Sequence, residues 1–196
     1  MASPESVTLK NLNGKFVMNK KLSDDFEPLL ALVRLSFNMS PSNTHTLQQG
    51  IGWVTRKALG LATVTLRVKQ YADDKGVVHI DIDQTATGGI KGTTELRQLD
   101  WQEGAHEDQI FGKVRGRTRW IKLSEVQDEY LKKGWNKETE EDDVIENYIE
   151  SVGSGWTAHG VWGFEQLEGK RYHVRHVIIK KKGEAKRAKL VYDYQI

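Results

Sequence analysis

Apolar and polar residues alternate with a period of two over most of the chain beyond residue 62, which is typical of β-strands with one buried face. The pattern is clearest in residues 63–69 and 78–83, which flank the turn signal at Asp73-Asp74-Lys75-Gly76 and predict an antiparallel hairpin. A first strand follows the turn signal Asn13-Gly14. The later expected strands are residues 91–99, 108–123 (one strand, or two joined at Gly116), 144–151, 156–165, 171–180 and 189–194.

Two segments near the N-terminus have a helical period instead. Phe26, Leu29, Leu30 and Val33 fall at helical spacing behind N-cap candidates at residues 23–25, and a second helix is expected over residues 51–61. A short helix is also expected near residues 128–135, whereas the acidic residues 138–143 predict a solvated loop.

These elements predict one mainly β domain over residues 1–196. About nine or ten strands joined by short turns favour an antiparallel up-and-down barrel, because closure removes the exposed sheet edges. The helical pair would form a helix-turn-helix lid over residues 24–61.

The composition of the chain excludes several classes of function. Lys and Arg exceed Asp and Glu by 29 − 27 = 2, which argues against a dedicated nucleic-acid binder. The absence of cysteine excludes disulfides, thiolate catalysis and cysteine-ligated zinc. The N-terminus lacks a signal-peptide pattern and no apolar run reaches 18 residues, so we expect a cytoplasmic protein, and we expect it to be a monomer.

The segment Gly50-Ile51-Gly52-Trp53-Val54-Thr55-Arg56-Lys57 resembles the second-helix motif of the intracellular fatty-acid-binding proteins, in the calycin superfamily of lipocalin-like barrels. Similar matches are Gly14-Lys15-Phe16 in the first strand, residues 63–69, the turn Glu168-Gly169-Lys170 and the closing strand at residues 190–194. The resemblance implies a ten-stranded barrel whose cavity holds a fatty acid, a retinoid or another apolar molecule. The family often has Arg-x-Tyr in the closing strand, but this chain has Leu190-Val191-Tyr192, so only the tyrosine remains.

Residues 33–48 interrupt this resemblance. Their removal would join Leu32 to Gln49 and give a sequence more similar to the family. The segment has 48 − 33 + 1 = 16 residues, begins with valine and ends with glutamine, so its codons can carry intron borders. We hypothesise that it is translated intron sequence; the alternative is a genuine loop of the lid, which an unbroken coding message would establish.

The chemistry-bearing residues favour binding over catalysis. No histidine pair has metal-ligand spacing and no nucleotide motif occurs, so we expect neither a metal nor a cofactor, and we assign no catalytic residue. Residues 171, 173 and 175 alternate with residues 172, 174, 176 and 178, and periodicity leaves open which set faces inward. The resemblance places Arg175 and His173 inside. The expected ligand-binding residues are Trp53, Gln84, Thr94, Trp120, Trp162, His173, Arg175 and Tyr192.

The basic residues Lys113, Arg115, Arg117 and Arg119 share one strand face, which we expect to be a solvated outer face paired with acids such as Asp81 and Asp83. The alternative is transient docking on an anionic membrane during ligand delivery.

The first functional hypothesis is a carrier, and not an enzyme, that reversibly binds a hydrophobic small molecule such as a fatty acid, a retinoid or a polyketide- or terpenoid-like ligand. The alternative is a cofactor-free isomerase or cyclase in the same cavity, with His173 or His159 as general acid or base and Tyr192 as hydrogen-bond donor. A filled barrel that serves as an interaction protein is a third option.

Overall fold

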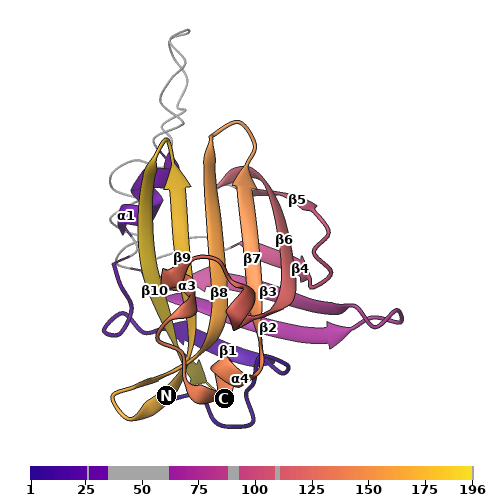
Figure 1. Cartoon of the computed structure of the whole chain (residues 1–196), viewed down its shortest axis with the longest axis vertical. Coiled ribbons are helices and arrows are strands. Elements are labelled where there is room, and N and C mark those ends of the chain that lie inside the picture. Colours follow the sequence, from indigo (N-terminus) through magenta and orange to yellow (C-terminus); the bar gives the residue numbers. More distant parts are fainter. Residues whose placement is uncertain (26, 35–61, 88–92, 109–110, 196) are drawn as a thin grey trace, which may run out of the picture.

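The structure, a computed structural model, describes residues 1–25, 27–34, 62–87, 93–108 and 111–195. Ten strands of the described residues form one antiparallel sheet that curls into a nearly closed barrel (Figure 1), as the alternating pattern predicted. The strands are β1 (Gly14–Met18), β2 (Val64–Ala72), β3 (Val78–Ala86), β4 (Thr94–Gln98), β5 (Gly104–Asp108), β6 (Gly112–Lys122), β7 (Asp143–Ser151), β8 (Trp156–Leu167), β9 (Lys170–Lys181) and β10 (Glu184–Gln195).

The sheet runs β4-β3-β2-β1-β10-β9-β8-β7-β6-β5, so only β1 beside β10 departs from sequence order. The strand expected over residues 108–123 is one strand, β6, which continues through Gly116, so the single-strand alternative is confirmed; β5 precedes it and was not expected. The seam between β4 and β6 is closed by side chains and loop backbone: Arg97 Nη1 donates to Thr118 Oγ1 at 3.3 Å, and the backbone NH of Trp101 donates to the Thr118 carbonyl at 2.9 Å.

Two tight turns join the last three strands, and the first of them, at Glu168-Gly169, lies where the sequence predicted a turn. Glu168 and Gly169 have φ of 49° and 73°, and Lys182 and Gly183 have φ of 48° and 85°. Two consecutive positive φ values match the right-handed twist of the strands that they join, so β8–β9 and β9–β10 are tight hairpins.

The helices lie outside the sheet. The α1 helix (Glu27–Arg34) contacts β9 and β10, as Figure 1 also shows, and confirms the first predicted helix, with Leu29 and Leu32 buried. The second predicted helix, at residues 51–61, lies outside the described residues, so the helix-turn-helix lid is not confirmed. Most of residues 33–48 also lies outside them. None of the helices described here is long and apolar enough to cross a membrane.

The α3 helix (Glu129–Lys132), preceded by the 3-10 turn η1 (Leu123–Glu125), confirms the short helix expected near residues 128–135. The prediction of a loop at residues 138–143 is wrong, because residues Lys137–Glu141 form the short helix α4. The Asn136 side chain caps α4 by accepting from the Thr139 NH at 3.0 Å, and Thr139 is buried against the Phe164 backbone, so these contacts override the acidic sequence.

Strand β9 is buried on both faces. One face carries His173 and Arg175; the other carries Tyr172, Val174 and Ile178, and every one of these residues is less than 9% exposed. The second face is covered by the segment that contains α3 and by Trp135, which stacks on His176 at 4.1 Å between ring centroids. This outer layer explains why alternation could not identify the inward face.

Candidate functional site

A cluster of charged and aromatic side chains occupies the barrel interior. The guanidinium of Arg175 on β9 lies 3.8 Å from the ring centroid of Trp162 on β8 and 5.3 Å from that of Tyr192 on β10. Arg97 on β4 also stacks on Trp162, at 5.3 Å. Because β4 and β8 are not neighbours in the sheet, this contact crosses the barrel and identifies the inner face.

His173 lies next to Arg175 and is 1% exposed. Its Nδ1 lies 3.1 Å from the carbonyl oxygen of Gly163, and Arg175 Nε donates to His173 Nε2 at 3.4 Å. A carbonyl accepts only, so Nδ1 carries the proton and Nε2 is the acceptor. Burial, reinforced by the Arg175 charge, holds the pKa of His173 well below its usual value, so the ring is neutral near pH 7 and positions the guanidinium.

Glu95 on β4 supplies the negative charge of the cluster. Arg97 Nε donates to Glu95 Oε2 at 2.9 Å, and the Gln84 amide donates to Glu95 Oε1. Burial opposes the charged form of Glu95, but Arg97 and Arg175 outweigh it and lower the pKa of the carboxyl below its usual value. Among the described residues of this cluster, two guanidinium groups therefore face one carboxylate, and the cluster carries an excess positive charge.

Two hydrogen-bond donors in the cluster are left over. Among the described residues, no hydrogen bond joins the terminal nitrogens of Arg175 or the hydroxyl of Tyr192 to a protein group, although the two residues are only 8% and 3% exposed. Burial raises the pKa of Tyr192, so its hydroxyl stays protonated and can donate. Buried donors normally have partners, so this pair points to a ligand that supplies an acceptor oxygen.

The structure brings most of the predicted ligand-binding residues to the inner face. Thr94 is the exception: its side chain is exposed, and its hydroxyl donates to Asp83 at 2.8 Å on the outer face, because Glu95 and not Thr94 has the inward parity of β4. Trp53 lies outside the described residues. The inward set is Gln84, Trp120, Trp162, His173, Arg175 and Tyr192, and ligand contact by these residues stays a prediction.

Sequence reasoning missed Glu95, Arg97 and Asn147. Opposite charges two residues apart on a short strand were the available signal for the first two, since such a pair shares one face. Asn147 accepts a hydrogen bond from the Trp162 indole NH at 2.9 Å and fixes the ring that lies under Arg175. Nothing in the sequence alone indicated this contact.

His159 does not belong to the interior. Its Nε2 lies 2.8 Å from Glu146 Oε1 on the outer face of β7 and β8, and Arg119 donates to the same carboxylate at 2.7 Å. The proposed role of His159 as a general acid or base in the cavity is therefore wrong.

The basic face of β6 points outward as predicted, but its acidic partners differ from those expected. Lys113 pairs with Glu107, Arg115 with Glu103 and Arg119 with Glu146. Arg117 stacks on Trp101 and Tyr148. These contacts are those of a solvated, internally paired surface. The described residues contain no group of three or more His, Cys, Asp or Glu able to hold a metal ion.

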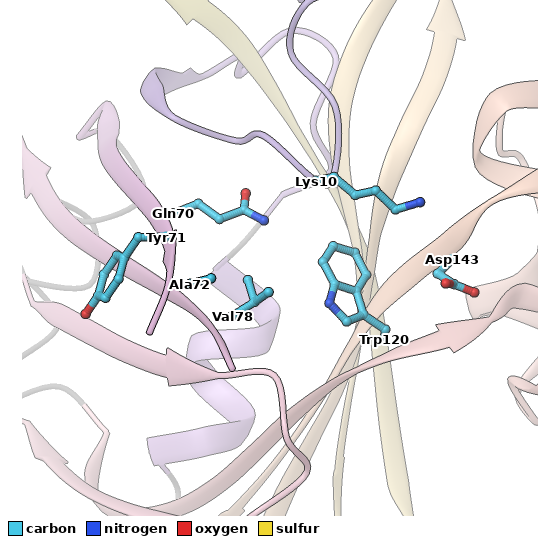
Figure 2. A pocket seen from close by; sticks show the side chains of 7 residues that line it. All are labelled: Lys10, Gln70, Tyr71, Ala72, Val78, Trp120 and Asp143. Carbon is cyan, nitrogen blue, oxygen red and sulfur yellow. The ribbon is translucent and has the colours of Figure 1, made fainter. Parts of the chain in front are cut away.

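A pocket of about 370 Å³ opens at one end of the barrel. Figure 2 shows the Trp120 ring facing Gln70 and Val78 across it, with Lys10 and Asp143 near its rim. Trp120 pairs with Ile145, and Ile145 pairs with Trp162, so the pocket and the Arg175 cluster share one wall.

Comparison with known proteins identifies relatives of full length. The chain is 36% identical to the probable pericyclase scpY of Mollisia scopiformis over 98% of its length and 94% of that protein. It is 30% identical to the pericyclase pydY of an Acremonium species, over 99% of its length and 97% of the relative. No family model matches the chain.

The fold is similar to that of As-p18, an extracellular fatty acid binding protein, with a TM-score of 0.51 and 16% identity over 96% of this chain and 99% of the other. The structural likeness shows the fold alone, a β-barrel like that of this fatty acid binding protein. From its identity and full-length coverage, the chain belongs to the family of these fungal pericyclases.

Proposed function

We propose that this protein is a pericyclase, which folds a hydrophobic conjugated substrate inside the barrel and accelerates a concerted ring closure. The observation that carries the proposal is the placement of the terminal guanidinium nitrogens of Arg175 and the hydroxyl of Tyr192 beside the Trp162 ring, with no hydrogen-bond partner among the described residues. The full-length similarity to two pericyclases supports it.

A pericyclic ring closure redistributes bonding electrons within one molecule. In an intramolecular cycloaddition, three π bonds become one π bond and two new σ bonds, and no proton, electron or group enters or leaves. The protein then has two tasks: to hold the reactive conformer and to polarise one partner of the cycloaddition.

The interior groups suit both tasks. Arg175 and Tyr192 would donate to a carbonyl oxygen conjugated with the reacting double bond and so withdraw electrons from it. The Trp162 face would pack against the π system, and His173 would hold Arg175 in place through the 3.4 Å contact with Nε. Removal of one preorganised donor typically slows an enzyme by ~10²–10³ where charge develops fully. A pericyclic transition state develops less charge, so we expect about tenfold per donor.

The test uses the linear substrate of either relative, with that relative as positive control. Conversion is followed by chromatography and mass spectrometry, since the product is an isomer of unchanged mass. We expect the protein to form the cyclised isomer, Tyr192→Phe to do so about tenfold more slowly, and Tyr148→Phe, on the outer face, to match the wild type. If both relatives convert their substrates and this protein converts neither, the proposal is wrong.

Carriage of a hydrophobic molecule is the second candidate, and the 370 Å³ pocket is the observation that favours it. A carrier would bind the linear substrate or its product without accelerating the conversion. The same assay separates the two functions when binding is measured beside turnover.

A further inference from the structure

The pocket at the barrel end is built from three separate parts of the chain. The N-terminal segment contributes Lys10, the β2–β3 hairpin contributes residues 70–72 and Val78, and the β6 and β7 ends contribute Trp120 and Asp143 (Figure 2). Neither the pericyclase proposal nor the Arg175 cluster uses this pocket.

The charged and amide side chains around the pocket already have partners. Gln70 accepts from the Leu12 backbone NH at 2.8 Å and donates to the Leu9 carbonyl at 3.1 Å. Lys10 pairs with Asp142 at 2.8 Å, and Asp143 with Lys122 at 2.8 Å.

What remains available in the pocket is mainly the apolar surface of Ala72 and Val78 and the indole ring of Trp120. An apolar wall beneath a rim of paired charges suits hydrocarbon better than a polar group.

The position of the pocket relates it to the buried donors. Trp120, Ile145, Trp162 and Arg175 form one row of directly paired residues across β6, β7, β8 and β9 on the inner face. Three steps between strands span ~14 Å along the curved wall. An extended covalent chain advances ~3.5 Å in three bonds, so about twelve bonds of substrate would connect the pocket at Trp120 with the Arg175 guanidinium.

We propose that this pocket is the subsite for the apolar far end of the substrate whose carbonyl group meets Arg175 and Tyr192. The substrate class is then an elongated molecule with one polar end and about twelve bonds of hydrocarbon beyond it. Fixing both ends restricts the conformations of the chain between them, which favours one folded conformer for ring closure. This inference rests on the proposed function, but its test measures binding alone.

The experiment is isothermal titration of the full chain with hexanoate, decanoate and tetradecanoate, whose carboxylates suit the excess positive charge at Arg175. Only the last two extend toward the pocket. We expect affinity to rise with chain length. Val78→Trp, which fills the pocket, lowers tetradecanoate affinity about tenfold, the contribution of roughly two buried methylene groups, and changes hexanoate affinity less than twofold.

Leu96→Trp is the matched control, because Leu96 lies on the outer face of β4 and is 74% exposed. It should leave all three affinities unchanged. Ala72→Leu, at the exposed end of β2, is a second filling variant should Val78→Trp not fold.

The inference is overturned if the filled variants bind tetradecanoate as tightly as the wild type, if they lose hexanoate equally, or if no alkanoate binds the wild type. If the protein selects alkanoates by chain length but turns over neither relative's substrate, the subsite proposal stands and the pericyclase proposal is wrong.

Discussion

Replacement of Glu95 by glutamine tests the electrostatics of the interior. The change removes the carboxylate that Arg97 and Gln84 contact and leaves two guanidinium groups without a counter-charge. Loss of one partner of a fully buried ion pair typically costs about 3–5 kcal/mol. The Glu95 side chain keeps 23% exposure, and glutamine keeps an acceptor oxygen, so we expect a loss of about 2 kcal/mol in the free energy of unfolding at pH 7.

The pH dependence gives this prediction its signature. Because the folded protein lowers the pKa of Glu95 below the usual 4.5, the carboxylate stabilises the fold above about pH 4.5, and this stabilisation is lost as the pH falls through the folded-state pKa. The difference between wild type and Glu95→Gln should therefore shrink in acid. Urea unfolding monitored by tryptophan fluorescence at several pH values measures it.

Two further variants make the result interpretable. Glu140→Gln on the exposed face of α4 removes a charge of the same sign and should cost far less. The double variant Glu95→Gln/Arg97→Met removes the unopposed guanidinium with its partner and should be more stable than Glu95→Gln alone. The reasoning fails if Glu95→Gln is no less stable than Glu140→Gln at pH 7, or if its deficit persists unchanged in acid.

Three other changes address packing and titration. Gly163→Ala should destabilise by about 1–3 kcal/mol in urea unfolding, because a Cβ there would lie 2.5 Å from Thr139 Cγ2 and 2.7 Å from Trp135 Cε3; a neutral result would contradict the packing of this segment on the sheet. Thr139→Val should cost about 1–3 kcal/mol in the same assay, since the Thr139 hydroxyl donates to the Phe164 carbonyl and accepts from its NH, while unchanged stability would show that these bonds contribute nothing. The rate of turnover of the relatives' substrates should be constant between about pH 6 and 8, because His173 stays neutral over this range. If the rate instead follows a single titration near the usual His pKa of 6.5, and His173→Gln abolishes that titration, His173 acts as a general acid or base and this prediction is wrong.

The barrel could be predicted from alternation, because nearly every strand has one face toward the interior and short turns join the neighbours. Alternation could not orient strand β9, because a helical segment covers its second face, so Tyr172 and Val174 are as buried as His173 and Arg175. The hydrophobic pattern distinguishes buried side chains from exposed ones. It cannot distinguish side chains inside the barrel from side chains on its outer face that another segment covers. The family resemblance supplied the correct face.

The polar interior was only half predictable for a related reason. Thr94 and Glu95 are neighbours with opposite orientations, and a five-residue polar strand gives no apolar stripe to fix its parity. Thr94 was chosen because it was interpreted as a polar residue on an otherwise apolar strand face, a pattern that suits a wet cavity. In the structure, Glu95 is tolerated there because it pairs with Arg97 and lies in the field of Arg175, and these partners come from pairings that a single strand does not reveal.

The protonation states of the interior also discriminate between the two enzyme classes considered. An acid–base isomerase needs a group that exchanges protons near neutral pH. The interior offers none among the described residues of the cluster: burial raises the pKa of Tyr192 and lowers that of His173, while Glu95 is held as a carboxylate by arginines. Each shift fixes one protonation state. Groups that keep their protons can donate hydrogen bonds steadily to a carbonyl throughout a reaction, and a pericyclic closure requires only that. The electrostatics that make this cavity unsuited to proton transfer therefore favour the polarising role proposed for Arg175 and Tyr192.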